Sequence, residues 1–325
     1  MHRKLPFMRL GEISHRPLAP VVAWLMVLVS LVLTACGTST LAQSSSSGST
    51  SPSGGAEAVW SVTRPFAIST IPDQEVAVLN RQFGAVASYL NRKTGLKVEY
   101  IPMVDYAALV TAFERGEIQL AWFGGLTAVQ AAAVVPNAEI FAQRRRDAEF
   151  HSKFIVMNDL PVRKLEDLKG LTFTFGSESS TSGHLMPLYY LRSAGINADK
   201  DFKGLPNFSG SHDKTVELVQ SGAFQAGALN EAVWERRVKE GTVDMNRVRA
   251  FYTTPAYFDY NWTIRGDVDR TFGSGAKQKV KDAILGMGPE QEETLKLFQT
   301  DKFIPSQNEN YSTIRKVAQS IGIIR

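Results

Sequence analysis

The chain has 325 residues and a formal net charge of +4, from 36 Lys and Arg against 32 Asp and Glu. Residues 1–35 hold four of the basic residues and one acidic residue, so the remainder carries a net charge of only +1. Nucleic-acid binding requires a basic surface on the folded part. The remainder has only local clusters such as Arg144, Arg145 and Arg146, which we interpret as a solvated loop. The composition therefore argues against a nucleic-acid partner.

The N-terminal segment predicts export and attachment to a membrane. Four basic residues precede an uncharged apolar stretch, residues 21–34, which is too short for a comfortable membrane span. The Leu-Thr-Ala-Cys run that ends at Cys36 resembles the lipobox of bacterial lipoproteins, in which the signal is cut before the cysteine and its sulfur takes up a diacylglycerol. We expect residues 1–35 to be a signal peptide and Cys36 to carry the lipid. The alternative is a signal-anchor helix with an incidental buried cysteine.

A flexible tether is predicted after this cysteine. Residues 36–58 are dominated by Ser, Thr and Gly, a composition that cannot bury enough apolar surface to fold. Because Cys36 is the only cysteine, no disulfide can form within the chain. The remaining residues, 59–325, are enough for one large or two medium-sized domains.

Alternating strand and helix patterns predict an α/β fold. The first predicted helix follows Asp73 as its N-cap and ends at Gly95, and a second runs over residues 105–115. Such alternation is typical of parallel sheets with helices on both faces. Further helices are predicted over residues 185–192, 215–220, 276–287, 290–298 and 311–321, and strands over residues 66–70, 98–102, 118–123, 154–157, 171–175, 226–229, 248–252 and 262–264.

The pattern also predicts two lobes. The middle of the chain repeats the alternation of strands and helices, and prolines mark its entry and its exit. We predict a first lobe from residues 59–157 plus 263–325 and a second lobe from residues 158–262, joined by two strand-like crossovers. Ligands of open parallel sheets bind at the carboxyl ends of the strands, beside helix N-termini. The cleft between the lobes is therefore the expected ligand site.

A turn rich in hydroxyl groups predicts an anion site in the second lobe. Residues 176–184, Gly-Ser-Glu-Ser-Ser-Thr-Ser-Gly-His, follow a predicted strand and precede a predicted helix. The first turn of a helix offers unpaired backbone N–H groups and a partial positive charge, and the hydroxyls of Ser180, Thr181 and Ser182 add further donors. Capping of the helix by one serine is the alternative. Four consecutive hydroxyl residues are more than a cap requires, so we favour the anion site.

Other candidate site residues stand at strand ends and helix starts. His212 opens a predicted helix, where it either donates a hydrogen bond to the same ligand or is simply exposed. Glu231 follows a short predicted strand, and Asp259 lies at the proposed return crossover. Trp122 is interpreted as a core residue. A metal site and a cofactor are not predicted, because no second His stands at ligand spacing and no further cysteine exists.

These residues carry a family resemblance. Across nearly all of residues 59–325 the chain resembles the substrate-binding proteins of ABC importers for phosphonate, phosphite and related oxyanions. The shared motifs are Asp-Tyr-Ala at 105–107, Ile-Gln-Leu-Ala-Trp-Phe-Gly at 118–124, Ser-Thr-Ser-Gly at 180–183 and Ser-His-Asp at 211–213. The resemblance implies a type II periplasmic-binding-protein fold, whose two lobes close on the ligand.

The resemblance also implies roles for single residues. Tyr106 would donate a hydrogen bond to an oxygen of the oxyanion, and His212 would donate from the second lobe. Ser180, Thr181 and Ser182 would hold the group at the helix start.

The resemblance points to four further positions. Two match the family only within one residue, and two differ from the family in residue type. The two acidic positions of the family fall near Glu231 and Asp259, each within one residue. A second tyrosine of the family is replaced here by Phe150, followed by His151. This departure removes one hydroxyl and offers an imidazole in its place.

The identity of the oxyanion depends on the two acids. Residues 122–126, 149–152 and 260–263 are most similar to a branch of the family described as selenate-binding. Selenate carries no proton at neutral pH, so a carboxylate in direct contact would repel it. Phosphite, hydrogen phosphate and aminophosphonates can donate a proton. We expect a phosphorus oxyanion if the acids line the cleft, and selenate stays open if they point away or pair with Arg.

The sequence thus predicts a monomeric, lipid-anchored binding protein on the periplasmic side of the cytoplasmic membrane. It would capture a small tetrahedral oxyanion and deliver it to an ABC permease and its ATPase, without catalysis. One alternative is a secreted hydrolase that uses Ser182, His212 and Asp259, although the chain has no Gly-x-Ser-x-Gly pentapeptide. Another is a sensing ectodomain that needs a separate receptor.

Overall fold

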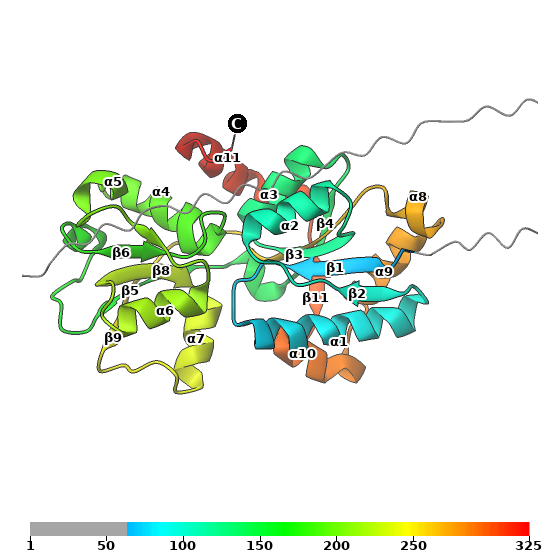
Figure 1. Cartoon of the computed structure of the whole chain (residues 1–325), viewed down its shortest axis with the longest axis horizontal. Coiled ribbons are helices and arrows are strands. Elements are labelled where there is room, and N and C mark those ends of the chain that lie inside the picture. Colours follow the sequence, from blue (N-terminus) through cyan, green and yellow to red (C-terminus); the bar gives the residue numbers. More distant parts are fainter. Residues whose placement is uncertain (1–63, 325) are drawn as a thin grey trace, which may run out of the picture. The chain divides into compact units, whose positions relative to one another are not determined.

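Two β-sheets organise the computed structural model, which describes residues 64–324 (Figure 1). Cys36, the predicted signal peptide and the predicted tether lie outside these residues. We call the part built on the six-stranded sheet the first lobe and the part built on the five-stranded sheet the second lobe.

The six-stranded sheet is mixed. Strands β2, β1 and β3 are parallel, and β10 runs antiparallel between β3 and β4, with β11 antiparallel at the edge. The order is β11-β4-β10-β3-β1-β2, with β1 at Phe66–Thr70, β2 at Val98–Tyr100, β3 at Leu120–Phe123, β4 at Glu139–Arg144, β10 at Asn261–Ile264 and β11 at Phe303–Pro305.

The five-stranded sheet has the same design. Strand β6 is parallel to β7 and β8, whereas β5 runs antiparallel between β8 and β9. The order is β7-β6-β8-β5-β9, with β5 at Ser152–Met157, β6 at Phe173–Phe175, β7 at Asn207–Phe208, β8 at Ala226–Asn230 and β9 at Val248–Thr253.

The crossing strands explain where the structure departs from the expected parallel sheets and lobe boundaries. Strands β5 and β10 are each the first strand after the chain passes from one sheet to the other, and each enters antiparallel. Strand β5 was predicted in the first lobe but pairs in the second sheet, while Trp262 in β10 was predicted in the second lobe but pairs in the first. The sequence located both crossovers within several residues. It could not show which sheet would hydrogen-bond the crossing strand.

Helices flank both sheets, and most of them follow the predicted periodicity. The first lobe has α1 at Val76–Thr94, α2 at Tyr106–Glu114, α3 at Gly125–Val134, α8 at Val268–Phe272, α9 at Ala276–Leu285, α10 at Glu292–Leu297 and α11 at Ser312–Ile321. The second lobe has α4 at Met186–Ser193, α5 at Ala198–Asp201, α6 at His212–Gln220 and α7 at Glu231–Lys239. Helix α3 was not predicted because it is apolar on nearly all sides and shows no amphipathic period.

One predicted helix cap is wrong. Helix α1 begins after Glu75, whose side chain makes no capping hydrogen bond, whereas Asp73 lies two residues earlier and is 3% exposed. By contrast, Asp105 caps α2 as expected, since its carboxylate accepts a hydrogen bond from Ala108 N at 2.7 Å. The start of α1 therefore needs an acceptor from elsewhere.

Aromatic side chains fill the core of the first lobe. Trp122 is 4% exposed and packs against Trp262, Phe298 and Phe303 with ring centroids 5.2–5.9 Å apart. Trp122 is therefore a core residue, as predicted. Within the described residues, no helix is both long and apolar enough to cross a membrane.

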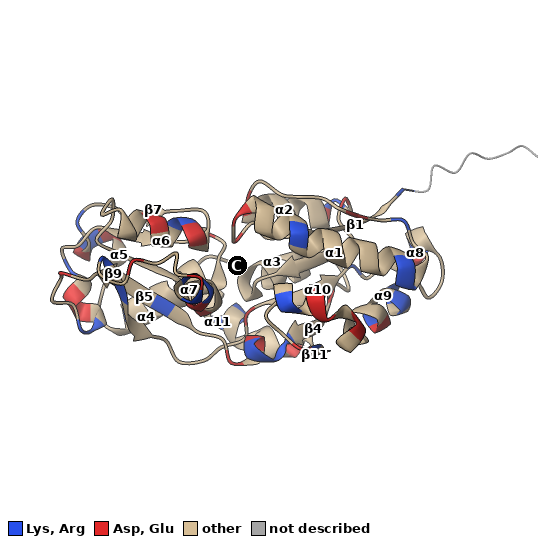
Figure 2. Ribbon diagram, turned by 90° about the horizontal axis from the view of Figure 1, so that it is seen from below, with Lys and Arg blue, Asp and Glu red and all other residues tan. Residues whose placement is uncertain are grey.

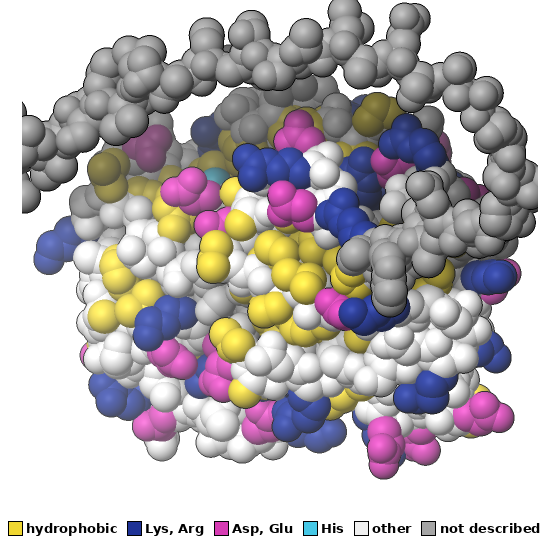
Figure 3. All heavy atoms as spheres, turned by 45° about the vertical axis from the view of Figure 1, so that its right-hand side comes forward, with side chains coloured by type: hydrophobic (Ala, Val, Ile, Leu, Met, Phe, Trp, Pro, Cys, Tyr) yellow, Lys and Arg dark blue, Asp and Glu magenta, His cyan; other side chains and the backbone are white. Residues whose placement is uncertain are grey.

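The charges on the surface are mixed. Lys and Arg are interspersed with Asp and Glu along the helices of both lobes (Figure 2), and the face in Figure 3 mixes both signs with apolar side chains. The interpretation of Arg144 as part of a solvated loop is wrong. Arg144 is 7% exposed at the end of β4, and its guanidinium contacts the fully buried carboxylate of Asp147 at 2.6 Å. Only Arg145 of the triplet is exposed.

Candidate ligand-binding site

The hydroxyl-rich turn forms the start of a helix in the second lobe. Residues Thr181–Leu185 make one π-helical turn that continues into α4, and Ser180, Thr181 and Ser182 are each at most 2% exposed. The Ser180 hydroxyl accepts a hydrogen bond from Gly183 N at 2.9 Å, so it does cap the helix. The Thr181 hydroxyl accepts one from Leu126 N of the first lobe, also at 2.9 Å. Both oxygens act as acceptors in these bonds, so each hydroxyl still has a proton to donate, and the Thr181 hydroxyl lies within reach of the Asp259 carboxyl.

His212 lies against this turn with one ring nitrogen unused. Its Nδ1 accepts a hydrogen bond from Asn230 N at 3.3 Å, which leaves the proton on Nε2. Burial lowers the pKa of His212 to about 4, so the ring is neutral at neutral pH. Nε2 is buried and has no partner among residues 64–324. A Cβ on Gly183 would lie 3.0 Å from both the His212 ring and the Ser180 hydroxyl, so a glycine is required for this close approach.

Tyr106 supplies a second buried donor, from the first lobe. It is the first residue of α2 and is 1% exposed, and its hydroxyl has no hydrogen-bond partner in the described part of the chain. Burial raises the pKa of Tyr106 well above its usual value, and the negative charges of Asp73 and Asp259 raise it further. The phenol therefore stays protonated and can donate.

Asp259 faces the hydroxyl-rich turn. One carboxyl oxygen, Oδ1, accepts a hydrogen bond from Gly125 N at 2.9 Å, and the other, Oδ2, is buried with no partner in the described residues. A Cβ on Gly124 would lie 3.2 Å from both Asp259 Oδ1 and Thr181 Oγ1, which places carboxyl and hydroxyl side by side. Burial raises the pKa of Asp259 to about 7, although the Gly125 N–H and the nearby hydroxyls of the turn lower it.

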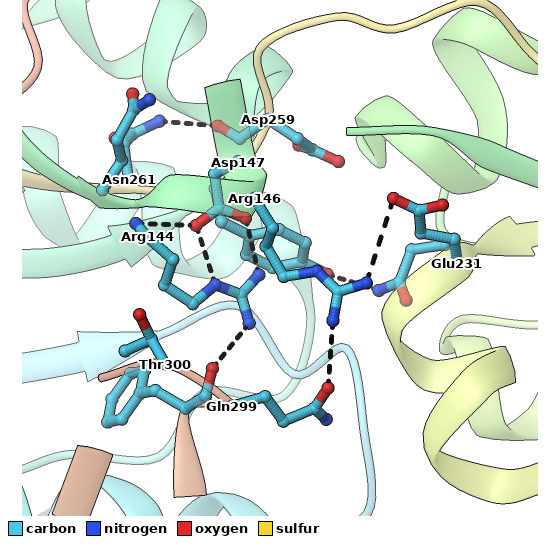
Figure 4. Close-up of polar contacts among 12 residues, drawn as sticks. Arg144, Arg146, Asp147, Glu231, Asp259, Asn261, Gln299 and Thr300 are labelled. Atoms are coloured by element: carbon cyan, nitrogen blue, oxygen red, sulfur yellow. Dashed lines mark hydrogen bonds and ion pairs between the residues drawn. The ribbon is translucent and has the colours of Figure 1, made fainter. Parts of the chain in front are cut away.

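Glu231 lies in a different environment. Its carboxylate is 3.9 Å from the Arg146 guanidinium and 4.0 Å from the Lys153 ammonium, and Figure 4 shows the contact with Arg146. Burial and the negative charge of Glu235 raise the pKa of Glu231 above its ordinary value, and His151, Arg146 and Lys153 offset only part of this rise. Within residues 64–324 no hydrogen bond or ion pair joins Glu231 to the turn at 180–182.

Phe150 and His151, where the sequence differs from the family, also lie outside the turn at residues 180–182. Phe150 is fully buried, with its ring centroid 5.5 Å from that of Tyr260. The His151 ring is half-buried, and its Nδ1 lies 2.7 Å from the carbonyl oxygen of Thr254. That hydrogen bond requires the proton on Nδ1.

A polar chain beside the site was missed by the sequence analysis. The Asp73 carboxylate accepts a hydrogen bond from the Tyr260 hydroxyl at 2.6 Å, and that hydroxyl accepts one from Asn230 Nδ2 of the second lobe at 2.8 Å. The carbonyl oxygen of Asp73 accepts a hydrogen bond from His212 N at 2.9 Å. Burial raises the pKa of Asp73 to about 6. A polar residue three positions after the buried strand β1 is the only signal for this polar chain in the sequence, and its spacing predicts a helix cap instead.

The geometry does not support a catalytic triad. In a serine hydrolase the histidine donates from Nδ1 to a carboxylate and accepts from the serine with Nε2. Here Nδ1 of His212 accepts a hydrogen bond from the backbone of Asn230 and therefore cannot donate to an acid. Among the described residues, no group of three or more His, Cys, Asp or Glu could hold a metal ion.

Together, the fold and the site define a two-lobed α/β ligand-binding protein whose buried polar atoms come from both lobes. Residues 68–311 match the family model described as ABC transporter, phosphonate, periplasmic substrate-binding protein. The chain belongs to this family. It is accordingly a periplasmic substrate-binding protein of an ABC transporter and not an enzyme, and the predicted type II fold is confirmed.

Similar proteins extend over most of the chain. A protein of Prochlorococcus marinus (strain MIT 9301), named as a probable ABC transporter phosphite-binding protein, PhnD1, is 40% identical over 82% of this chain and 93% of its own length. The phosphonates-binding periplasmic protein of Escherichia coli (strain K12) is 26% identical over 70% of this chain and 68% of its own. The solved structure of the Prochlorococcus PhnD1 in complex with methylphosphonate has a TM-score of 0.78 and 39% identity, and covers 81% of this chain and all of that one.

Proposed function

We propose that the protein captures a small phosphorus oxyanion that carries one ionisable proton, of the class of methylphosphonate and phosphite. The observation that carries this proposal is a set of three buried polar atoms without partners in the described residues: the Tyr106 hydroxyl, Nε2 of His212 and Oδ2 of Asp259. Leaving such atoms unpaired costs about 1–3 kcal/mol each. A ligand that satisfies all three would recover that free energy.

The chemistry of the three atoms defines the ligand. Tyr106 and neutral His212 are donors, and the hydroxyls of the turn at 180–182 add more, so an anion can be bound without a counter-charge. Asp259 differs, because its free oxygen must either accept a proton from the ligand or carry one itself. With its pKa raised to about 7, Asp259 can share one proton with a phosphonate or phosphite oxygen.

The two acids answer the selenate question differently. Asp259 lies beside the turn and has no cationic partner, which favours a ligand that can donate a proton. Glu231 lies 3.9 Å from Arg146 and 4.0 Å from Lys153, so its charge is partly compensated without any ligand. We infer that Asp259 binds the ligand directly, and that Glu231 and His151 lie at the margin of the site. Fully ionised selenate would then bind only when Asp259 is protonated.

The relatives support the choice of ligand class. The Prochlorococcus protein is named for phosphite and has been solved with methylphosphonate. We propose the same class for this chain, with Tyr106, Ser180, Thr181, Ser182, His212 and Asp259 as the contacting residues.

We propose further that the protein acts as a monomer, held at the membrane by a lipid on Cys36. The tether at residues 36–58 would link the lipid to the two lobes, divided near the predicted boundaries. With its lobes closed around the ligand, the protein would deliver the ligand to the permease and its ATPase. Anchoring keeps the binding protein near its permease at high effective concentration.

The test of ligand class is isothermal titration of residues 59–325 with methylphosphonate, phosphite, phosphate, sulfate and selenate. We expect the first two to bind most tightly and sulfate and selenate to bind at least 100-fold more weakly at pH 8. Absence of binding to every phosphorus oxyanion would refute the proposal. So would a preference for selenate.

The anchor has its own test. We expect Cys36→Ser to move the full-length protein from the membrane fraction to the soluble fraction, or to leave it unprocessed, with ligand affinity unchanged. A processed Cys36→Ser protein that stays in the membrane fraction would refute lipidation at this residue.

A further inference from the structure

The residue next to His212 joins the two lobes. Asp213 lies in the first turn of α6 in the second lobe, and its side chain is 4% exposed. Its Oδ2 accepts a hydrogen bond from Glu75 N of the first lobe at 3.1 Å. Its Oδ1 accepts hydrogen bonds from Arg236 at 2.9 Å and from Arg237 at 3.1 Å, both in the second lobe. One carboxylate thus contacts both lobes.

The contact in the first lobe is at the start of α1. This helix has 19 residues and no capping side chain of its own, because the Glu75 side chain makes no cap and Asp73 binds Tyr260. The N-terminus of a helix carries unpaired N–H groups and a partial positive charge, which favour a carboxylate. Asp213 therefore caps α1 from the opposite lobe.

We propose that Asp213 is a positioning residue that couples ligand capture to closure of the lobes. His212, directly before it, donates its backbone N–H to the Asp73 carbonyl at 2.9 Å and presents Nε2 to the ligand site. Movement of the start of α6 toward the first lobe therefore brings the His212 ring to the ligand and Asp213 to α1 together. The proposal rests on the proposed function in its use of methylphosphonate as the ligand and of His212 as a ligand contact.

The partners of Asp213 explain why this contact can open and close. When the lobes part, Asp213 keeps its two arginines, since Arg236 and Arg237 lie in the same lobe, and Glu75 N can bind water. Opening therefore leaves no charge uncompensated, and the contact adds a modest bias to the closed state. An interaction made only after closure slows ligand release and leaves the encounter rate unchanged.

The sharpest test removes the donor and leaves the carboxylate in place. Glu75 has φ −59°, which a proline accepts, so Glu75→Pro deletes the N–H that Asp213 binds. The matched control is Glu75→Ala, which removes the same side chain and keeps the N–H. We expect Glu75→Pro to bind methylphosphonate about three- to tenfold more weakly than Glu75→Ala, as for loss of one charge-assisted hydrogen bond that water partly replaces.

Kinetics and a double-mutant cycle complete the test. We expect the dissociation rate of methylphosphonate to rise by the same factor, with the association rate within about twofold. Asp213→Asn has one acceptor oxygen, which cannot serve both Glu75 N and the two arginines. If that oxygen stays with the arginines, Asp213→Asn should weaken binding in the wild-type background and have no further effect in Glu75→Pro, because both changes then break the same contact. Small-angle scattering should show both variants less compact than Glu75→Ala at subsaturating ligand.

Two outcomes would overturn the inference. Equal affinities and release rates for Glu75→Pro and Glu75→Ala would show that the contact does not bias closure. Additive losses in the double variant would show that Asp213 acts elsewhere. A wild-type protein that does not bind methylphosphonate would instead count against the proposed ligand, and the scattering comparison would then be made with the oxyanion that does bind.

Discussion

Two carboxyl groups of the predicted site, Asp259 and Glu231, were equivalent in the sequence and differ in the structure. Glu231 directly follows β8 and Asp259 lies two residues before β10, and both match acidic positions of the family within one residue. Asp259 is 1% exposed and accepts one backbone hydrogen bond, and no Lys or Arg among residues 64–324 forms an ion pair with it. Glu231 is 8% exposed and has an arginine and a lysine within 4.0 Å.

The difference shows what makes a buried acid available to a ligand. A carboxylate that is already compensated by cations gains little from a bound proton donor. An uncompensated one in an apolar site holds its proton near neutral pH and can share it. The predictions below test this distinction between the two acids.

The largest effect is expected at Asp259. Asp259→Asn keeps an oxygen for Gly125 N but places an amide where the free carboxyl oxygen lies. We expect methylphosphonate to bind about 10- to 100-fold more weakly, since a hydrogen bond to a charged group contributes about 1.5–3 kcal/mol. An amide N–H can donate to a fully ionised oxyanion, so the preference over selenate should narrow. Titration with both ligands at pH 8 measures this, and equal losses for both would contradict it.

Asp259 should also set how the stability of the ligand-free protein depends on pH. Its pKa is about 7 in the folded protein, against an ordinary value of 3.8 for an aspartic acid, so the folded state binds the proton more tightly than the unfolded chain. The contribution of this carboxyl group to the free energy of unfolding is therefore greatest below about pH 4, and it decreases as the pH rises toward 7. The asparagine of Asp259→Asn does not titrate, so this variant does not lose stability in that way. We expect its melting temperature to exceed that of the wild type by a few degrees at pH 8.

The melting-temperature difference should shrink as the pH falls from 7 to 4. Asp73 and His212 titrate in both proteins and cancel in the comparison. Differential scanning calorimetry without ligand measures the difference. A variant that is less stable than the wild type at pH 8 would mean that ionised Asp259 is compensated by a group other than the ligand.

A smaller effect is expected at Tyr106. Tyr106→Phe removes one neutral donor, and we expect methylphosphonate to bind about three- to tenfold more weakly, as for a hydrogen bond of about 0.5–1.5 kcal/mol. Stability without ligand should not fall, because the hydroxyl has no partner in the described residues. Tyr89→Phe is the matched control, since Tyr89 donates to Ala283 O in the same lobe at 2.8 Å. That variant should lose stability and keep affinity.

The smallest effect is expected at Glu231. Glu231→Gln should change the affinity for methylphosphonate by less than about threefold, since the carboxylate is already compensated by Arg146 and Lys153. Titration at the same pH as for Asp259→Asn gives a direct comparison of the two acids. A tenfold loss would place Glu231 on the ligand and remove the distinction.

Much of the architecture could be predicted because its signals are local. Apolar runs and three- and four-residue spacing gave eight of the strands and the longer amphipathic helices within a few residues. Strands β4, β7 and β11 and helices α3, α5, α7 and α8 were missed; β7 and β11 are short edge strands, and α3 is apolar on nearly all sides. The mixed sheets were missed as well, because strand direction depends on which sheet receives a strand after it crosses.

The candidate site divides in the same way. The sequence by itself determined where a hydroxyl-rich helix start and a histidine at a helix start would lie, since residue type and position suffice for that, and the family resemblance added Tyr106 as a predicted ligand contact. Only the tertiary structure decided that Asp259 is uncompensated and Glu231 is not, that Asp73 binds Tyr260, and that Asp213 caps α1 across the lobes. Burial and charge pairing here depend on residues 78 to 187 positions apart, and no local pattern in the chain records those contacts.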